Sequence, residues 1–274
     1  MTQLSEAVVL ITGAAGGFGQ QFTRQLLMAN SQLILTDLNQ TVLEKQTEII
    51  QRQVTTGKII ACLSADLSNR EGCENLYHQV KSLGVPVDIL INNAGIGLFG
   101  RMDEVPSEKW EQLMQVNLLA PMRLSTLFAA DMIARQKGHI VNISSVAGWS
   151  APAGLAHYAT SKFGLRGFSE GLFDEVKDYN VKVTVVYPFF SRTPILKSQG
   201  YGTLAKEIAD FPEKLATDPE KVIQKTIQGI SRDRLHVFPD PIARNIQLLK
   251  RFAPWSLDWI SNQFRRRLES GTSQ

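Results

Sequence analysis

The sequence predicts an α/β protein with a doubly wound, parallel sheet of about seven strands and helices on both faces. Short apolar runs rich in Val, Ile and Leu alternate with longer segments whose apolar residues recur at helical spacing. Strands that alternate with helices in this way are joined by right-handed crossovers and lie parallel. With 274 residues, 43% of them hydrophobic and 20% charged, the chain can bury a core without disulfides or metal ions.

The expected strands share a high content of β-branched and aliphatic residues and are bounded by polar or glycine-rich turns. In chain order they cover residues 7–12, 32–36, 58–63, 87–92, 139–143, 181–187 and 234–238. The expected helices share apolar residues three or four positions apart, which form one buried side. In chain order they cover residues 18–29, 42–53, 70–82, 107–135 and 155–178. Except before the last strand, a helix therefore separates each strand from the next.

The pattern predicts one domain over residues 1–240 and a basic amphipathic extension over residues 241–274. Between residues 242 and 267 the extension has six basic residues and one acidic residue. Its apolar residues recur at helical spacing, with two tryptophans one turn apart; they are Leu257, Ile260, Phe264, Leu268, Trp255 and Trp259. Such a helix can cap a substrate cleft, pack against a second subunit or lie on a membrane surface, and a loose tail is a fourth alternative.

Several classes of protein are disfavoured by composition. The formal net charge of +3 is too small to indicate nucleic acid as the main partner. Cys62 and Cys73 are too few for a disulfide framework, and the four histidines lack the spacing of metal ligands. No apolar run is long enough for a membrane-spanning helix, and no secretory signal begins the sequence. We therefore expect a cytoplasmic protein without a metal ion, with peripheral membrane contact through the C-terminal helix as a further option.

The turn after the first strand indicates a dinucleotide site. Its sequence, TGAAGGFG at residues 12–19, lets backbone N–H groups and a helix N-terminus approach a pyrophosphate. Asp37 ends the second strand, where a carboxylate accepts hydrogen bonds from the adenosine ribose and repels a 2′-phosphate. No basic residue follows Asp37, so NAD is favoured over NADP. The same aspartate can also serve as a turn residue or helix N-cap.

Three polar residues point to proton transfer. Tyr158 and Lys162 lie one turn apart on an expected helix, and Ser145 follows the fifth expected strand at the edge where such sheets bind ligands. A tyrosine is a poor base at neutral pH because its pKa is about 10, and a neighbouring ammonium group stabilises the phenolate. The arrangement therefore indicates acid–base chemistry on a bound substrate.

These motifs together resemble those of the classical short-chain dehydrogenase/reductase family, over roughly residues 5–195. The matching elements are the loop at 12–19, Asp66 and Leu67 after the third strand, Asn92, Asn93, Ala94 and Gly95 at the end of the fourth, and a tetrad of Asn117, Ser145, Tyr158 and Lys162. The resemblance implies a single-domain Rossmann-type fold and hydride exchange with a nicotinamide cofactor. The loop spacing also fits the extended, epimerase-containing branch of the family, but chain length and the position of Ser145 favour the classical branch.

The resemblance also implies a role for each tetrad residue. Tyr158 is the general acid in reduction and the general base in oxidation, and Ser145 hydrogen-bonds the substrate oxygen. Lys162 lowers the pKa of Tyr158 and holds the nicotinamide ribose. Asn117 positions a water that relays protons to the lysine.

The residues implied to contact the cofactor are Thr12, Gly13, Gly17, Phe18, Gly19, Asp37, Asp66, Leu67, Asn93, Ala94, Gly95, Tyr158, Lys162, Pro188 and Thr193. The expected substrate pocket is apolar and includes Phe99, Trp149, Phe189 and Phe190. Phe189 stands where the family has a glycine beside the nicotinamide, so its ring either points away or lines the pocket. An apolar pocket favours a lipophilic alcohol or ketone over a sugar or small acid.

The sequence therefore predicts an NAD(H)-dependent oxidoreductase that interconverts an alcohol and its ketone or aldehyde. One alternative is an NADPH-dependent carbonyl or 3-ketoacyl reductase, against which Asp37 argues. Another is a catalytically silent dinucleotide-sensing protein, against which the complete tetrad argues. The family implies a homodimer or homotetramer, and no nucleic-acid partner is expected.

Overall fold

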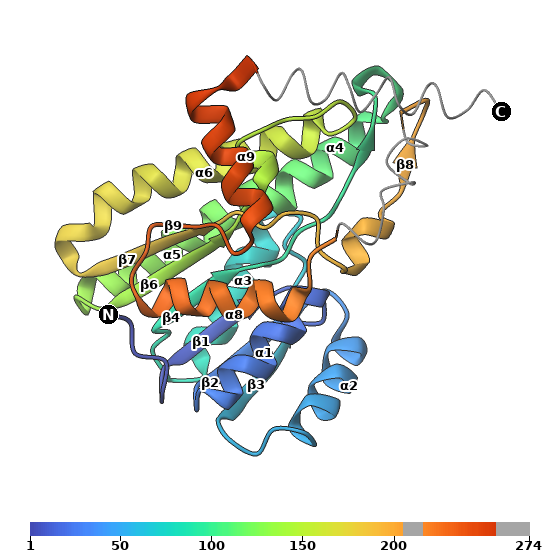
Figure 1. The fold of residues 1–274 in the computed structure, drawn as a ribbon. Helices are drawn as coiled ribbons and strands as arrows, with labels where there is room; N and C mark the ends of the chain where they lie inside the picture. The colour runs from blue at the N-terminus through green and yellow to red at the C-terminus, as the bar shows by residue number, and fades with distance from the viewer. Residues whose placement is uncertain (205–215, 256–274) are drawn as a thin grey trace.

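A computed structural model describes residues 1–204 and 216–255, and its main feature is a parallel sheet of seven strands between two layers of helices (Figure 1). Across the sheet the strand order is β3-β2-β1-β4-β6-β7-β9. The strands are β1 (Val8–Thr12), β2 (Gln32–Asp37), β3 (Lys58–Ser64), β4 (Ile89–Asn92), β6 (Gly138–Ile143), β7 (Val181–Val186) and β9 (His236–Val237). The chain thus starts in the middle of the sheet, builds one edge and then crosses to build the other. This topology confirms the predicted doubly wound, Rossmann-type fold.

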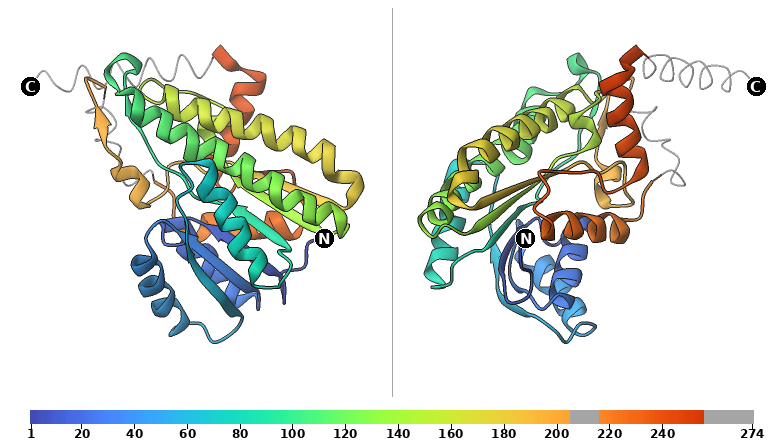
Figure 2. Two further views of the ribbon diagram at one scale, coloured as in Figure 1. Left: turned by 180° about the vertical axis from the view of Figure 1, so that it is seen from behind. Right: turned by 60° about the vertical axis from the view of Figure 1, so that its left-hand side comes forward.

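The helices that flank the sheet form two layers. They are α1 (Gly17–Met28), α2 (Gln40–Gln51), α3 (Arg70–Ser82), α4 (Ser107–Met114), α5 (Ala120–Ala134), α6 (Ala156–Val176) and α8 (Pro219–Ser231), and α9 (Pro241–Phe252) follows the last strand. Figure 1 shows α1 and α8 on the near face of the sheet, and the view from behind in Figure 2 shows α3, α5 and α6 on the opposite face.

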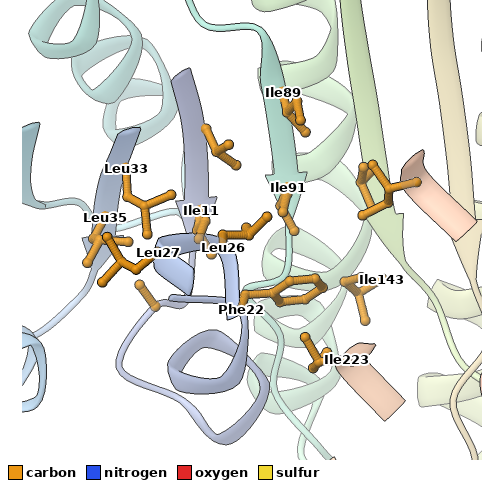
Figure 3. Close-up of a cluster of buried hydrophobic side chains, with 14 of the residues drawn as sticks. Ile11, Phe22, Leu26, Leu27, Leu33, Leu35, Ile89, Ile91, Ile143 and Ile223 are labelled. Atoms are coloured by element: carbon orange, nitrogen blue, oxygen red, sulfur yellow. The ribbon is translucent and has the colours of Figure 1, made fainter. Parts of the chain in front are cut away.

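Alternating residues of each strand supply the two halves of the core, because successive side chains of a strand point to opposite faces. On one face, Phe22 of α1 packs among Ile11, Ile91, Ile143 and Ile223, which come from three strands and α8 (Figure 3). On the other face, buried side chains of α3 and α5 pack against side chains of the strands. This half of the core includes Leu76 of α3, Phe128 of α5 and the strand residues Leu10, Leu90 and Ile140.

Three features differ from the sequence prediction or go beyond it. The segment 107–135, expected as one helix, is interrupted by a π-helical turn, Gln115–Leu119, between α4 and α5. Helix α8 was not expected, although Asp218 as N-cap and Pro219 at the first position are strong start signals. A small parallel pair, β5 (Phe99–Gly100) with β8 (Gly200–Tyr201), joins the loops that follow β4 and β7.

Only the first part of the expected C-terminal extension can be compared with the prediction. Helix α9 begins at Pro241, where Asp240 caps it. The amphipathic positions predicted beyond it, Leu257, Trp259, Ile260, Phe264 and Leu268, lie outside the described residues, and the boundary between residues 240 and 241 as a domain limit stays a prediction. Within residues 1–204 and 216–255, no helix is long and apolar enough to cross a lipid bilayer.

His139, at the start of β6, makes the stability of the fold dependent on pH. Its ring is buried between the hydroxyl groups of Thr2 and Thr184, each 2.8 Å from a ring nitrogen. Burial lowers the pKa of His139 from 6.5 to about 4. The unfolded chain therefore takes up a proton at a higher pH than the folded protein, so stability is lost as the pH falls from 6.5 toward 4.

We predict that His139 alone removes about 2 kcal/mol from the free energy of unfolding between pH 7 and pH 5. Urea unfolding at both pH values, for wild type and for His139→Gln, measures this contribution and separates it from titrating carboxylates. The variant should lose less stability than wild type over this interval. An equal loss in the two proteins would contradict the assignment.

Candidate active site

A cavity of about 640 Å³ lies at the carboxyl ends of the parallel strands. Its lining comes from the loops after β1, β2, β3, β4, β6 and β7, which is where open α/β sheets bind ligands. Asp37 and Asp66 line one end of it, and Tyr158 and Lys162 line the other. Of the residues predicted to contact a cofactor, those on the lining are Gly13, Gly17, Phe18, Asp37, Asp66, Leu67, Asn93, Ala94, Gly95, Tyr158, Lys162, Pro188 and Thr193.

The loop between β1 and α1 is tightly packed and needs glycine at two positions. Gly13 has a φ of +64°, and a Cβ there would lie 2.8 Å from the Cα of Ala94. A Cβ on Gly19 would lie 2.1 Å from the carbonyl oxygen of Gly13, so Gly19 lets the first turn of α1 close onto the loop. Gly19 therefore shapes the loop without lining the cavity.

The N-terminus of α1 faces the cavity through Gly16, Gly17 and Phe18. No side chain caps this end and no acidic residue lies in its first turn, so the positive end of the helix dipole is not neutralised locally. This arrangement fits the pyrophosphate of a dinucleotide.

Asp37 and Asp66 contribute negative charge to the end of the cavity next to the N-terminus of α1. The Asp37 carboxylate accepts hydrogen bonds from the backbone N–H groups of Ala15 (2.9 Å) and Leu38 (2.8 Å). Hydrogen bonds from Ser68 hold the pKa of Asp66 below its usual value. Among the described residues that line the cavity, Lys162 is the single lysine or arginine, and it belongs to the opposite end.

Thr12 and Asn93 connect the loops that leave β1 and β4. The Thr12 hydroxyl oxygen accepts the backbone N–H groups of Asn93 and Ala94, both at 3.0 Å. The side-chain amide of Asn93 donates to the carbonyl oxygens of Thr12 (2.9 Å) and Gly13 (3.0 Å). Thr12 is buried and does not line the cavity, so its part in the site is to hold these two loops together.

Asn117 lies in the π-helical turn and is fully buried. Its side-chain oxygen accepts the N–H of Ile96 (2.8 Å), and its amide nitrogen donates to the Ile96 carbonyl oxygen (2.9 Å). A Cβ on Gly95 would lie 3.3 Å from the Asn117 oxygen and 3.8 Å from Lys162 Nζ, so these groups are close neighbours. The loop after β4 is thus fixed against the helix that follows it.

Tyr158, Lys162 and Ser145 meet at the other end of the cavity. Lys162 Nζ donates to the carbonyl oxygen of Ile143 (2.9 Å) and lies 5.5 Å from the centroid of the Tyr158 ring. Burial raises the pKa of Tyr158 to about 12, while a hydrogen bond with Ser145 favours the phenolate. Burial also lowers the pKa of Lys162 to about 8. The group can therefore hold a proton on Tyr158 and a charge on Lys162 near neutral pH.

Of the four residues expected around the substrate, Phe99, Phe189 and Phe190 line the cavity. The rings of Phe189 and Phe190 pack edge to face at 5.2 Å. Lining residues that the sequence prediction did not include are found on many loops and also on helical segments; among the latter are Gln112 on α4, Val116 on the π-helical turn and Leu155 just before α6. Their sequence signal is weak because each also reads as an ordinary helix residue.

Trp149 is the exception, because the structure does not place it on the cavity lining. Its ring packs against Tyr187 (5.8 Å) and Phe238 (5.9 Å), and the Arg166 guanidinium carbon lies 3.4 Å from its centroid. These partners hold the indole away from the site, so the assignment of Trp149 to the substrate pocket is not supported by the packing.

Comparison with known proteins identifies the class. The profile of the family described as short chain dehydrogenase matches residues 7–202. The chain belongs to the classical short-chain dehydrogenase/reductases, which makes it an oxidoreductase with a nucleotide-binding Rossmann fold.

Individual relatives are similar over most of their length. Human epidermal retinol dehydrogenase 2 is 32% identical over 250 residues, which are 90% of this chain and 78% of the relative. A short-chain dehydrogenase/reductase from Burkholderia phymatum in complex with NAD superposes with a TM-score of 0.83 at 22% identity, over 94% of this chain and 96% of that one. A short-chain dehydrogenase from Sphingobium yanoikuyae in complex with NADPH gives 0.76 at 23% identity, over 98% and 96%. The likeness to these structures concerns the fold alone.

We predict that Asn117→Ala lowers the free energy of unfolding by about 2 kcal/mol. Both hydrogen bonds to the Ile96 backbone are lost, and a half-buried N–H and C=O are left without them. Chemical denaturation measures the change. Asn245→Ala, at an exposed position of α9, is the matched control and should stay within about 0.5 kcal/mol of wild type. Equal stability of the two variants would show that Asn117 does not hold the loop.

Proposed function

We propose that this protein is an NAD-dependent oxidoreductase that interconverts a lipophilic alcohol and its ketone or aldehyde. The observation that carries the proposal is the meeting of Tyr158, Ser145 and Lys162 at one end of a cavity whose other end fits the adenosine half of a dinucleotide. When bound, the nicotinamide supplies the hydride acceptor for oxidation or the hydride donor for reduction.

Tyr158 moves the proton in this proposal. In reduction its phenol donates a proton to the carbonyl oxygen of the substrate, and in oxidation its phenolate takes the proton of the alcohol. Ser145 hydrogen-bonds the same substrate oxygen and stabilises the charge that develops on it. Because burial raises the pKa of Tyr158 to about 12, the phenol stays protonated near neutral pH.

Lys162 provides the positive charge that makes the phenolate accessible. Its ammonium group is held by the Ile143 carbonyl oxygen, 5.5 Å from the centroid of the Tyr158 ring, where its charge would stabilise the phenolate. Lys162 would also hold the nicotinamide ribose. Asn117 holds the loop after β4 through Ile96 and would position, next to this loop, a water that passes protons to Lys162.

The choice of NAD over NADP rests on charge. Asp37 would accept hydrogen bonds from the adenosine ribose, and Asp66 with Leu67 would flank the adenine. A 2′-phosphate at this end would face two carboxylates and, among the described lining residues, no cation. The N-terminus of α1 and the loop residues Gly13 and Gly17 would hold the pyrophosphate.

A lipophilic substrate is supported by the side chains at the Tyr158 end. Phe99, Phe189 and Phe190 line it together with aliphatic residues of neighbouring loops, among them Ile96, Val116, Leu155, Ile195 and Leu196. Apolar walls with a few polar groups suit a hydrophobic alcohol or carbonyl compound. The similarity to a retinol dehydrogenase agrees with this class of substrate. A homodimer or homotetramer completes the proposal on the strength of the family resemblance, and the two cysteines without a disulfide framework favour the cytoplasm.

We predict that Tyr158→Phe lowers kcat by roughly 10²–10⁴-fold and leaves the Kd for NADH nearly unchanged, because the hydroxyl that transfers the proton is lost while the other residues of the cofactor site remain. Initial rates with a panel of lipophilic ketones and aldehydes, together with NADH titration by fluorescence, measure both quantities. In the wild type, alcohol oxidation should rise with pH above neutrality because it needs deprotonated Tyr158, and carbonyl reduction should not. Wild-type cofactor binding without turnover on any substrate would favour a dinucleotide sensor instead.

We predict that wild type prefers NADH to NADPH and that Asp37→Asn shifts this preference toward NADPH by on the order of tenfold. The asparagine keeps one oxygen for the Ala15 N–H, and it removes the charge together with the acceptor for the Leu38 N–H. The measurement is kcat/KM for both cofactors with one substrate. Glu44→Asn, on the neighbouring helix α2, is the control for an unspecific charge effect. A wild-type preference for NADPH would overturn the cofactor assignment.

A further inference from the structure

Helix α9 presents apolar side chains to solvent on the side that faces away from the domain. Of its residues, Ala243 alone is fully buried. Leu248 is 40% exposed and Phe252 is 74% exposed, and Trp255, three residues beyond the end of the helix, is also 74% exposed. The helix stands at the edge of the molecule in both views of Figure 2. Large apolar residues that are exposed on a helix and just beyond its end indicate a surface that contacts a lipid membrane or another protein.

Basic residues flank these apolar residues. Arg244 and Arg251 lie four positions before and three positions after Leu248, so both are its neighbours on the helix surface. The Arg251 guanidinium carbon lies 5.5 Å from the centroid of the Phe252 ring. Between residues 241 and 255 the sequence contains three basic residues and no acidic one. We call Arg244, Leu248, Arg251 and Phe252, together with Trp255 just beyond the end of the helix, the outer face of α9.

We propose that the outer face of α9 docks on the surface of an anionic lipid membrane. Large apolar side chains would enter the headgroup region, and the arginines would reach the lipid phosphates with their long stems along the apolar boundary. A second copy of the chain fits less well. A symmetric contact through this face would place the arginines of both copies against one another, with no acidic residue of the helix to pair with them.

Hydrogen bonds of Asp240 connect the start of α9 with the cavity lining. Buried Asp240 accepts the Ala243 N–H (2.7 Å) with one carboxylate oxygen and the Phe189 N–H (3.0 Å) with the other. One side chain therefore fixes both the start of α9 and the backbone of a residue on the cavity lining. If the substrate is lipophilic, as in the proposed function, docking would hold the substrate end of the cavity at the lipid surface. The docking itself does not depend on catalysis.

The test is co-sedimentation of the full chain with vesicles of phosphatidylcholine alone or mixed with phosphatidylserine. We expect binding to the mixed vesicles that weakens as salt is raised, because salt screens the arginines. The double variant Leu248→Ser/Phe252→Ser should bind at least about tenfold more weakly. Met28→Ser/Ile49→Ser replaces apolar residues that are 64% and 41% exposed on other helices, and should bind like wild type. Circular dichroism checks that each variant is folded.

A second pair of variants tests the charge. Arg244→Gln/Arg251→Gln should weaken binding to the phosphatidylserine vesicles, and Lys221→Gln/Lys225→Gln, at exposed positions of α8, should not. Equal binding by wild type and the Leu248/Phe252 variant would overturn the proposal, as would equal binding to both kinds of vesicle. An oligomer that dissociates in the same variant, without vesicle binding by wild type, would assign the face to a second copy. Because vesicle binding and turnover are separate readouts, failure here leaves the proposed function untouched.

Discussion

The close contact between the loops that leave β1 and β4 is the constraint on which the rest of the site depends. These strands are neighbours, but the chain turns toward one edge of the sheet after β1 and toward the other after β4. The crevice that opens between the diverging connections is the place for a ligand in this topology. Thr12 and Asn93 tie the two loops with four hydrogen bonds to backbone groups, and Gly13 lets them approach. The shape of this end of the cavity is therefore held by contacts within the chain itself.

The other end of the cavity is built by attaching α6 to β6. Lys162 is held at both ends, since its carbonyl oxygen accepts the Ser144 hydroxyl (2.9 Å) and its Nζ donates to the Ile143 carbonyl oxygen (2.9 Å). This attachment brings Tyr158 to Ser145, which lies just after the same strand. Burial shifts the pKa values of Tyr158 and Lys162 in opposite directions, because it disfavours the charged form of each. The proposed proton transfer thus depends on the same packing that stabilises the domain.

Asp240 links the Phe189 end of the cavity with helix α9 at the surface of the molecule. Phe189 and Phe190 extend the apolar lining, and Asp240 ties the backbone of Phe189 to the start of α9. The buried Asp240 carboxylate has hydrogen bonds at both oxygens, which is what makes its burial tolerable. A movement of α9 would therefore shift the backbone of Phe189 at the cavity. The proposed lipid-docking surface and the proposed site for a lipophilic substrate are connected through this contact.

The sequence by itself determined the class of fold, because a parallel sheet covered on both faces needs continuous apolar runs and its crossovers need helical ones. It also determined the glycine loop and the positions of Tyr158 and Lys162, which are local in the chain. Only the tertiary structure decided the π-helical turn at Asn117, since that turn is held by hydrogen bonds to Ile96 in another segment. It also decided where Trp149 lies, because the partners that hold its ring come from distant elements. Side-chain direction depends on such distant contacts, and residue type and spacing do not encode them.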